Sequence, residues 1–150
     1  MRPEQLLPHD IVQRGLVRGN EYAWPIEDIP KVIEAARLAN LVSLGGQLQF
    51  RLPDGICECY WVDVSTDVPT SLPWQEQVDR TAAAALANFT RLLSEFDFVA
   101  EGRTAFAEPF KRFEAQGGDP VQTMCFVWYL TDDRANDRFP GHDHDPNRLC

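Results

Sequence analysis

The chain has 150 residues, 44% of them hydrophobic, including nine Phe, four Trp and three Tyr. This length and composition suit one domain whose core needs neither disulfides nor a structural metal. The 23 acidic and 14 basic residues give a net charge of −9, which disfavours direct binding to nucleic acid or to an anionic membrane surface.

Two helices are expected in the first 40 residues. Pairs of apolar residues recurring every four or five positions predict a helix over about residues 5–18. A second helix is predicted over residues 29–40, with Asp28 as its N-cap. Pro30 fits this assignment because proline is tolerated in the first turn of a helix, where its missing N–H has no intrahelical partner.

A hairpin of two strands is expected next. Residues 41–50 alternate in polarity, which predicts a strand with Leu44 facing the core and Ser43 facing solvent. The sequence Pro-Asp-Gly at 53–55 has the composition of a tight turn. Residues 56–64 would then return antiparallel, and their apolar character on both faces favours an inner strand.

The rest of the chain completes a single α+β domain. Apolar spacing predicts a long helix over about residues 72–96 and a shorter one over 104–115 that Pro109 would break or kink. Residues 121–130 are apolar on both faces and predict a strand inside the sheet. We therefore expect an antiparallel sheet of about three strands packed by these helices, within residues 1–131. Residues 132–150 read as a polar, flexible tail.

The first residues lack the basic start and apolar run of a signal peptide, and no window is long enough to span a bilayer. The expected location is therefore the cytoplasm. The four cysteines, Cys57, Cys59, Cys125 and Cys150, are sparse and lie mostly in apolar runs, which predicts buried free thiols.

Two groups of residues have the chemistry of metal ligands. Cys57 and Cys59 would point to one face of a strand, but a closed zinc site needs two more ligands and no second pair or histidine motif supplies them. His142, Asp143 and His144 are the densest ligand set, yet nothing in the sequence makes that segment rigid. We expect no cofactor and keep one alternative: a small metal-binding protein or metal-dependent hydrolase that uses this tail.

No catalytic constellation stands out. His9, His142 and His144 all lie near the chain ends in polar contexts, and none makes a convincing general base. Glu58 is the best placed carboxylate, although a hydrogen-bonded structural role explains it more simply. The glycine pair Gly45–Gly46 falls inside a strand, which indicates a β-bulge or a close backbone contact rather than a phosphate loop. A binding protein is therefore favoured over an enzyme.

The sequence Gly19-x-Glu21-x-Ala23-Trp24, followed by a helix, by Leu44-Gly45-Gly46 and by a hairpin ending in Tyr60-Trp61, resembles immunity proteins of bacterial polymorphic toxin systems. The resemblance covers roughly residues 6–94. It implies a small, acidic, cytoplasmic α+β protein that neutralises a cognate toxin by tight binding, without catalysis. A regulatory or assembly module with another partner is the remaining possibility.

The implied mechanism is occlusion of a basic toxin by an acidic surface, with a few aromatic or charged anchors. Candidate anchors are charged or aromatic residues near the ends of predicted elements: Glu21, Trp24, Asp63 and Trp74. Glu21 and Trp24 are expected where the chain approaches its second helix.

Overall fold

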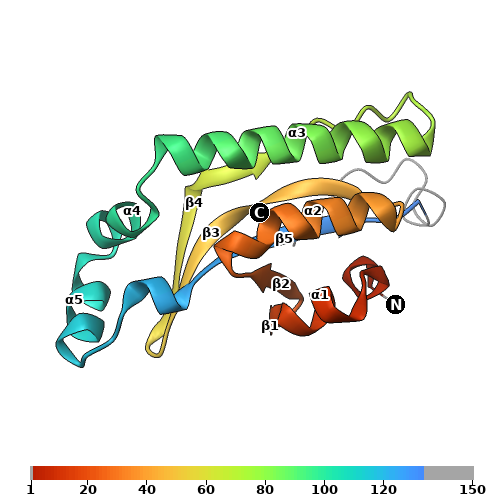
Figure 1. Cartoon of the computed structure of the whole chain (residues 1–150). Coiled ribbons are helices and arrows are strands. Elements are labelled where there is room, and N and C mark those ends of the chain that lie inside the picture. The colour runs from red at the N-terminus through yellow and green to blue at the C-terminus, as the bar shows by residue number, and fades with distance from the viewer. Residues whose placement is uncertain (1, 134–150) are drawn as a thin grey trace.

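The computed structural model describes residues 2–133, which form an α+β fold around one five-stranded antiparallel sheet (Figure 1). The strands lie in the order β1-β2-β5-β3-β4, and every neighbouring pair is antiparallel. Their bounds are β1 (Leu16–Arg18), β2 (Glu21–Trp24), β3 (Val42–Leu52), β4 (Gly55–Ser65) and β5 (Met124–Thr131). Strand β5, the last in sequence, is therefore central, as its apolar faces predicted.

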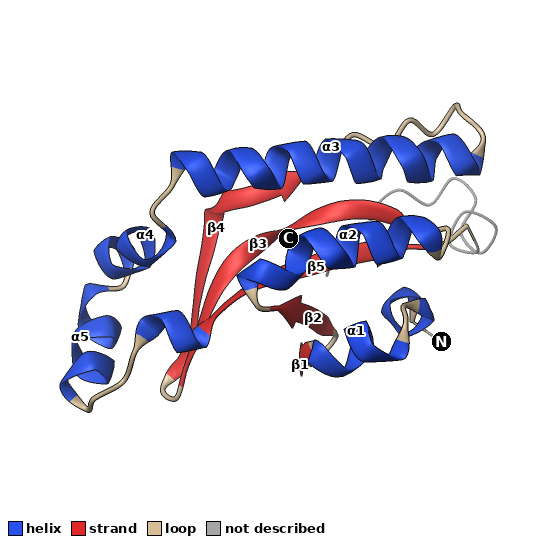
Figure 2. Cartoon of the chain, viewed as in Figure 1, coloured by secondary structure: helices blue, strands red, loops and turns tan. Residues whose placement is uncertain are grey.

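Helices cover one face of this sheet (Figure 2). They are α1 (His9–Arg14), α2 (Ile29–Leu38), α3 (Trp74–Glu95), α4 (Phe98–Ala105) and α5 (Ala107–Ala115), with short 3-10 turns at Pro3–Leu6, Ile26–Asp28 and Pro120–Thr123. Helices α2 and α3 run side by side across the sheet, and α4 and α5 continue past the end of α3. In the described part of the chain, no helix is both long and apolar enough to cross a membrane.

The structure confirms the α+β class but corrects the strand count from about three to five. The predicted helix over residues 5–18 is α-helical only at His9–Arg14, after the 3-10 turn that ends at Leu6, and the chain then forms the hairpin of β1 and β2. Leu16 comes five residues after Ile11, a step that a helix with 3.6 residues per turn places on a different face. Glu21 and Trp24 therefore belong to a strand, a few residues before α2.

Two further expectations need correction. The segment expected as one helix over residues 104–115 contains two, separated at Phe106, and Pro109 lies within the first turn of α5 rather than at the break. Strand β4 lies at the edge of the sheet, not inside it. Both sets of apolar residues in β4 reach the same core because its register shifts against β3: Cys57 and Cys59 before the shift and Val62 and Val64 after it are all buried. The Trp61 ring stacks on Phe106 at 6.5 Å and its Nε1 donates to Glu101 Oε1 at 3.1 Å.

The main core fills the space between the sheet and its helices. Its largest side chains are fully buried aromatics from strands and helices: Trp24, Trp128, Phe50, Phe89, Phe110 and Phe126. The Trp24 indole N–H donates to the Ile11 carbonyl oxygen at 2.8 Å, so this buried polar group keeps a partner and holds α1 against β2. Arg14 donates to Asp28 at 2.7 Å and ties the end of α1 to the start of α2.

At the glycine pair, β3 leaves no room for a Cβ beside its neighbouring strands. An added Cβ at Gly45 would lie 2.0 Å from the carbonyl oxygen of Val64 on β4, and one at Gly46 would lie 1.6 Å from that of Val127 on β5. Gly45 also has a φ of 115°, which L side chains rarely adopt. Glycine is therefore required at both positions, because the atoms that a Cβ would meet belong to the backbone of a neighbouring strand and not to a side chain that could move.

The same place carries a shift in register that reverses which residues face the helices. The β3–β5 pairing slips between Ser43 and Gly45. Ser43, expected to face solvent, is buried, and its N–H donates to Thr81 Oγ1 on α3 at 3.2 Å. Leu44, expected to face the core, instead lines a hollow on the opposite face. A strict alternation cannot anticipate this because a bulge adds one residue to the pattern.

We predict that Gly46→Ala destabilises the protein by about 3 kcal/mol or more, because the new methyl meets a backbone carbonyl that cannot rotate away. Gly19→Ala is the matched control: Gly19 has a φ of 59° but nothing within 4 Å of an added Cβ. Its cost should be limited to the strain of a left-handed residue, about 1–2 kcal/mol. Urea unfolding followed by tryptophan fluorescence measures the free energy of unfolding of both variants. If Gly46→Ala loses no more stability than Gly19→Ala, the packing described at Gly46 is contradicted.

Candidate functional site

The sheet face turned away from α2 and α3, here called the polar face, carries side chains from four strands. In antiparallel pairs, residues directly opposite each other project to the same side. Gln49 pairs with Glu58 on β4 and Cys125 on β5, so the three share this face. Its buried apolar cluster contains strand residues only, Ala23, Cys125 and Val127, whereas the cluster on the other face includes residues from the helices.

Five side chains form a closed ring of hydrogen bonds across the polar face. Tyr129 donates to Glu21 Oε2 at 2.6 Å. Gln47 Nε2 donates to Tyr129 Oη at 2.9 Å and to Glu58 Oε1 at 2.7 Å. Gln49 Nε2 donates to Glu58 Oε2 and, at 3.4 Å, to Glu21 Oε1, which completes the ring. The ring joins β2, β5, β3 and β4, so it fixes side chains from segments distant in sequence.

The ring determines how each polar group is oriented. Tyr129 gives its one proton to Glu21, so its oxygen is available to accept from Gln47. Both N–H groups of Gln47 are then used, by Tyr129 and Glu58, and its Oε1 accepts no hydrogen bond from any described residue. The corresponding oxygen of Gln49 accepts from Arg51 Nε at 2.9 Å. Gln47 is only 8% exposed, so its orientation is held firmly.

The environment of the ring keeps Tyr129 protonated. Burial raises the pKa of the Tyr129 phenol well above its ordinary value near 10, and the hydrogen bond it donates to Glu21 raises it further. The bond accepted from Gln47 acts in the opposite direction but is weaker. At neutral pH the phenol therefore remains a hydrogen-bond donor, which is what Glu21 requires.

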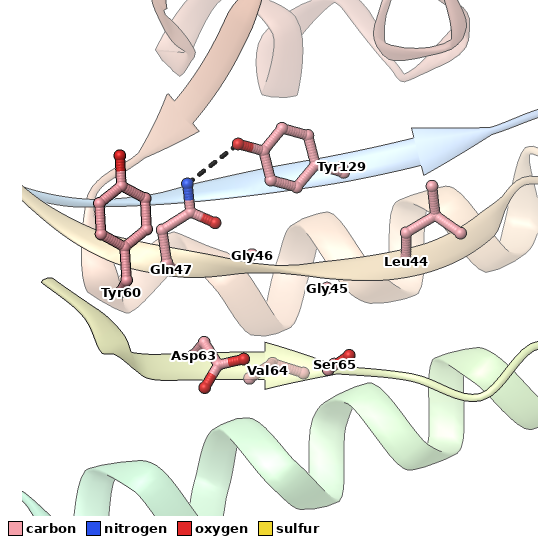
Figure 3. Close-up of a pocket in the computed structure, with 9 residues that line it drawn as sticks. All are labelled: Leu44, Gly45, Gly46, Gln47, Tyr60, Asp63, Val64, Ser65 and Tyr129. Atoms are coloured by element: carbon pink, nitrogen blue, oxygen red, sulfur yellow. Dashed lines mark hydrogen bonds between the residues drawn. The ribbon is translucent and has the colours of Figure 1, made fainter. Parts of the chain in front are cut away.

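A hollow of about 470 Å³ lies beside the ring, at the glycine pair (Figure 3). Gly45 pairs with Tyr129 on one side and Ser65 on the other, so the missing side chain leaves space between them. Asp63, opposite Gln47 in the register, is the one charged residue among those described as lining it. The full lining consists of Leu44, Gly45, Gly46, Gln47, Tyr60, Asp63, Val64, Ser65 and Tyr129.

The structure separates the four candidate anchors. Glu21 and Asp63 both lie on the polar face, Glu21 within the ring and Asp63 exposed at the hollow. Trp24 is 0% exposed, which places it in the core rather than on a surface. Trp74 lies at the start of α3, where its Nε1 donates to the Asn40 carbonyl oxygen at 2.9 Å and joins α3 to the end of α2.

The cysteines do not converge on one site. Cys57 and Cys59 pair with Phe50 and Leu48 and face the helices, whereas Cys125 faces the polar side with Gln49. Within residues 2–133 there is no group of three or more His, Cys, Asp or Glu residues arranged to hold a metal ion. The other candidate ligands, His142, Asp143 and His144, lie outside the described residues.

Three residues of this site were not singled out from the sequence: Gln47, Gln49 and Tyr129. A signal existed for the two glutamines, since both fall on the polar side of the alternation in residues 41–50. Nothing local identifies Tyr129, because its partners Glu21 and Gln47 are 108 and 82 residues away in the chain. Its role follows only from strand order.

Comparison with protein-family models, with curated proteins and with solved structures finds no match to this chain. The chemistry of the polar face is therefore what points to a function.

We predict that Tyr129→Phe lowers the free energy of unfolding by about 1–3 kcal/mol at pH 7, because Glu21 loses a donor and Gln47 an acceptor. Above pH 10 the difference from wild type should narrow. The folded pKa of Tyr129 is raised above its unfolded value, so the wild-type contribution is present below about pH 10 and is lost as pH rises through the folded pKa. Urea unfolding at pH 7 to 11 checks this; a constant difference would contradict it.

We also predict that Cys57, Cys59 and Cys125 are unreactive in the folded protein. All three are buried, and burial raises the pKa of Cys59 to about 12 and that of Cys125 to about 11. Little thiolate therefore exists at pH 8. In a Cys150→Ser variant, a colorimetric thiol reagent should detect no fast-reacting thiol before urea is added and three afterwards. Rapid labelling of one thiol in the folded protein would refute the prediction.

Proposed function

We propose that this protein is an immunity protein of a bacterial polymorphic toxin system, acting in the cytoplasm by binding and occluding its cognate toxin. The observation that carries the proposal is the polar face, where a closed ring of hydrogen bonds fixes side chains beside a hollow. Side chains held before binding lose little conformational entropy when a partner docks. This arrangement suits tight recognition.

Charge supports a basic protein as the partner. The chain carries a net charge of −9, and the polar face bears the carboxylates of Glu21, Glu58 and Asp63. Such a surface accelerates encounter with a cationic protein and repels nucleic acid and anionic membranes. The aromatic ring of Tyr60, which is 56% exposed, adds a residue type that dominates binding energy at interfaces.

The geometry of the carboxylates favours binding over catalysis. Both oxygens of Glu58 accept bonds from Gln47 and Gln49, and both oxygens of Glu21 accept from Gln49 and Tyr129. A general acid or base must exchange a proton with a substrate, which requires a carboxyl oxygen that is accessible to it. Here these oxygens hold neighbouring side chains in place.

We predict that co-expression of this protein with the product of the adjacent toxin gene restores bacterial growth and that the two proteins co-purify as a stable complex. Blocking by surface contact should need no cofactor and leave the toxin chemically intact, which mass spectrometry of the recovered toxin can establish. An unrelated acidic immunity protein serves as the control. Unrelieved toxicity together with the absence of a complex would refute the proposed function.

A further inference from the structure

We propose that the hollow at Gly45–Gly46 receives a single basic side chain, arginine or lysine, from the protein that docks on the polar face. This inference rests on the proposed function only in naming a protein as the source of that side chain. The chemistry of the hollow itself supplies the argument, since its acceptors, its aromatic rings and its shape all suit a cation.

Two oxygen acceptors stand next to each other in the hollow. Asp63 and Gln47 are directly paired across β4 and β3, so their side chains project to the same side. Asp63 is an exposed carboxylate, and Gln47 is 8% exposed with an amide oxygen that has no donor among the described residues. Because solvent reaches this oxygen, it is available as an acceptor to a ligand that brings N–H groups.

The ring of hydrogen bonds keeps this acceptor turned to the hollow. Gln47 cannot reverse its amide without placing its oxygen against the carboxylate of Glu58, which only accepts hydrogen bonds. The carboxylates of Glu58 and Glu21 accept hydrogen bonds from Gln47 and Tyr129, so negative charge lies next to both of these lining residues. The residues described as lining the hollow include no basic side chain that could neutralise Asp63 internally.

Aromatic rings border the acceptors. Figure 3 shows Gln47 between the rings of Tyr60 and Tyr129. A guanidinium or ammonium group is attracted to the face of an aromatic ring, and the planar guanidinium also stacks on it. Tyr129 is fixed by its bonds to Glu21 and Gln47, so its ring is already in position.

The shape of the hollow suits one long side chain. Glycine at 45 and 46 leaves backbone as its floor, and Leu44 offers an apolar surface for the methylene groups of a lysine or arginine stem. The space of about 470 Å³ is open to solvent on the side of Asp63, which is exposed. A basic side chain can therefore enter without any movement of the strands.

A direct test uses three short peptides and the full-length protein labelled with ¹⁵N. Acetyl-Gly-Arg-Gly-amide and acetyl-Gly-Lys-Gly-amide should shift the amide resonances of Gly45, Gly46 and Gln47 at about 10 mM or below. The citrulline peptide, which has nearly the shape of the arginine peptide but no charge, should not. No shift with either basic peptide, or an equal shift with citrulline, would overturn the inference.

Two variants with the same change of charge extend the test to the protein partner. Asp63→Asn should weaken both the peptide response and the affinity for the toxin by about tenfold or more. Asp67→Asn removes an exposed carboxylate that does not line the hollow, and its effect should stay within about twofold. Equal weakening by both variants would show a general field effect and overturn the inference. If no toxin complex forms, the proposed function fails, and the peptides alone decide the chemistry of the hollow.

Discussion

The backbone contact at the glycine pair is the constraint on which the rest of the sheet depends. Strand β3 runs between β4 and β5 with carbonyl oxygens of Val64 and Val127 occupying the space where side chains would begin. This contact requires two glycines, and the neighbouring register shift turns Ser43 to the helices and Leu44 away from them. The hollow on the polar face follows from that local geometry.

The polar face shows how a sheet can hold charged groups without an ion pair for each. Glu21 and Glu58 keep their hydrogen bonds through neutral amides and one phenol, which distribute donors between two carboxylates. Such networks are rigid when every member has a partner, because the low local dielectric makes a broken bond costly. The result is a surface whose polar groups are held in fixed positions, built on the same strands that form the core.

The sequence identified elements better than their assembly. Helices α2 and α3 and strands β3, β4 and β5 were predicted near their true limits, because their apolar spacing is regular over many residues. The β1–β2 hairpin was missed because each of its strands has at most four residues, too few to establish a period. The site was only partly predictable: Asp63 was named, but its pairing with Gln47 depends on register, and the ring depends on strand order.

The edges of the sheet influence how any partner can approach. Strand β1 has only three residues, and β4 carries an irregularity in which Tyr60, Trp61 and Val62 have no opposite residue on β3. A short edge and an interrupted edge both resist the addition of a foreign strand, which needs a long regular row of free N–H and C=O groups. Self-association into extended sheets is opposed for the same reason. Under the proposed function, recognition then proceeds through side chains on a face, where a single altered residue can change the choice of partner.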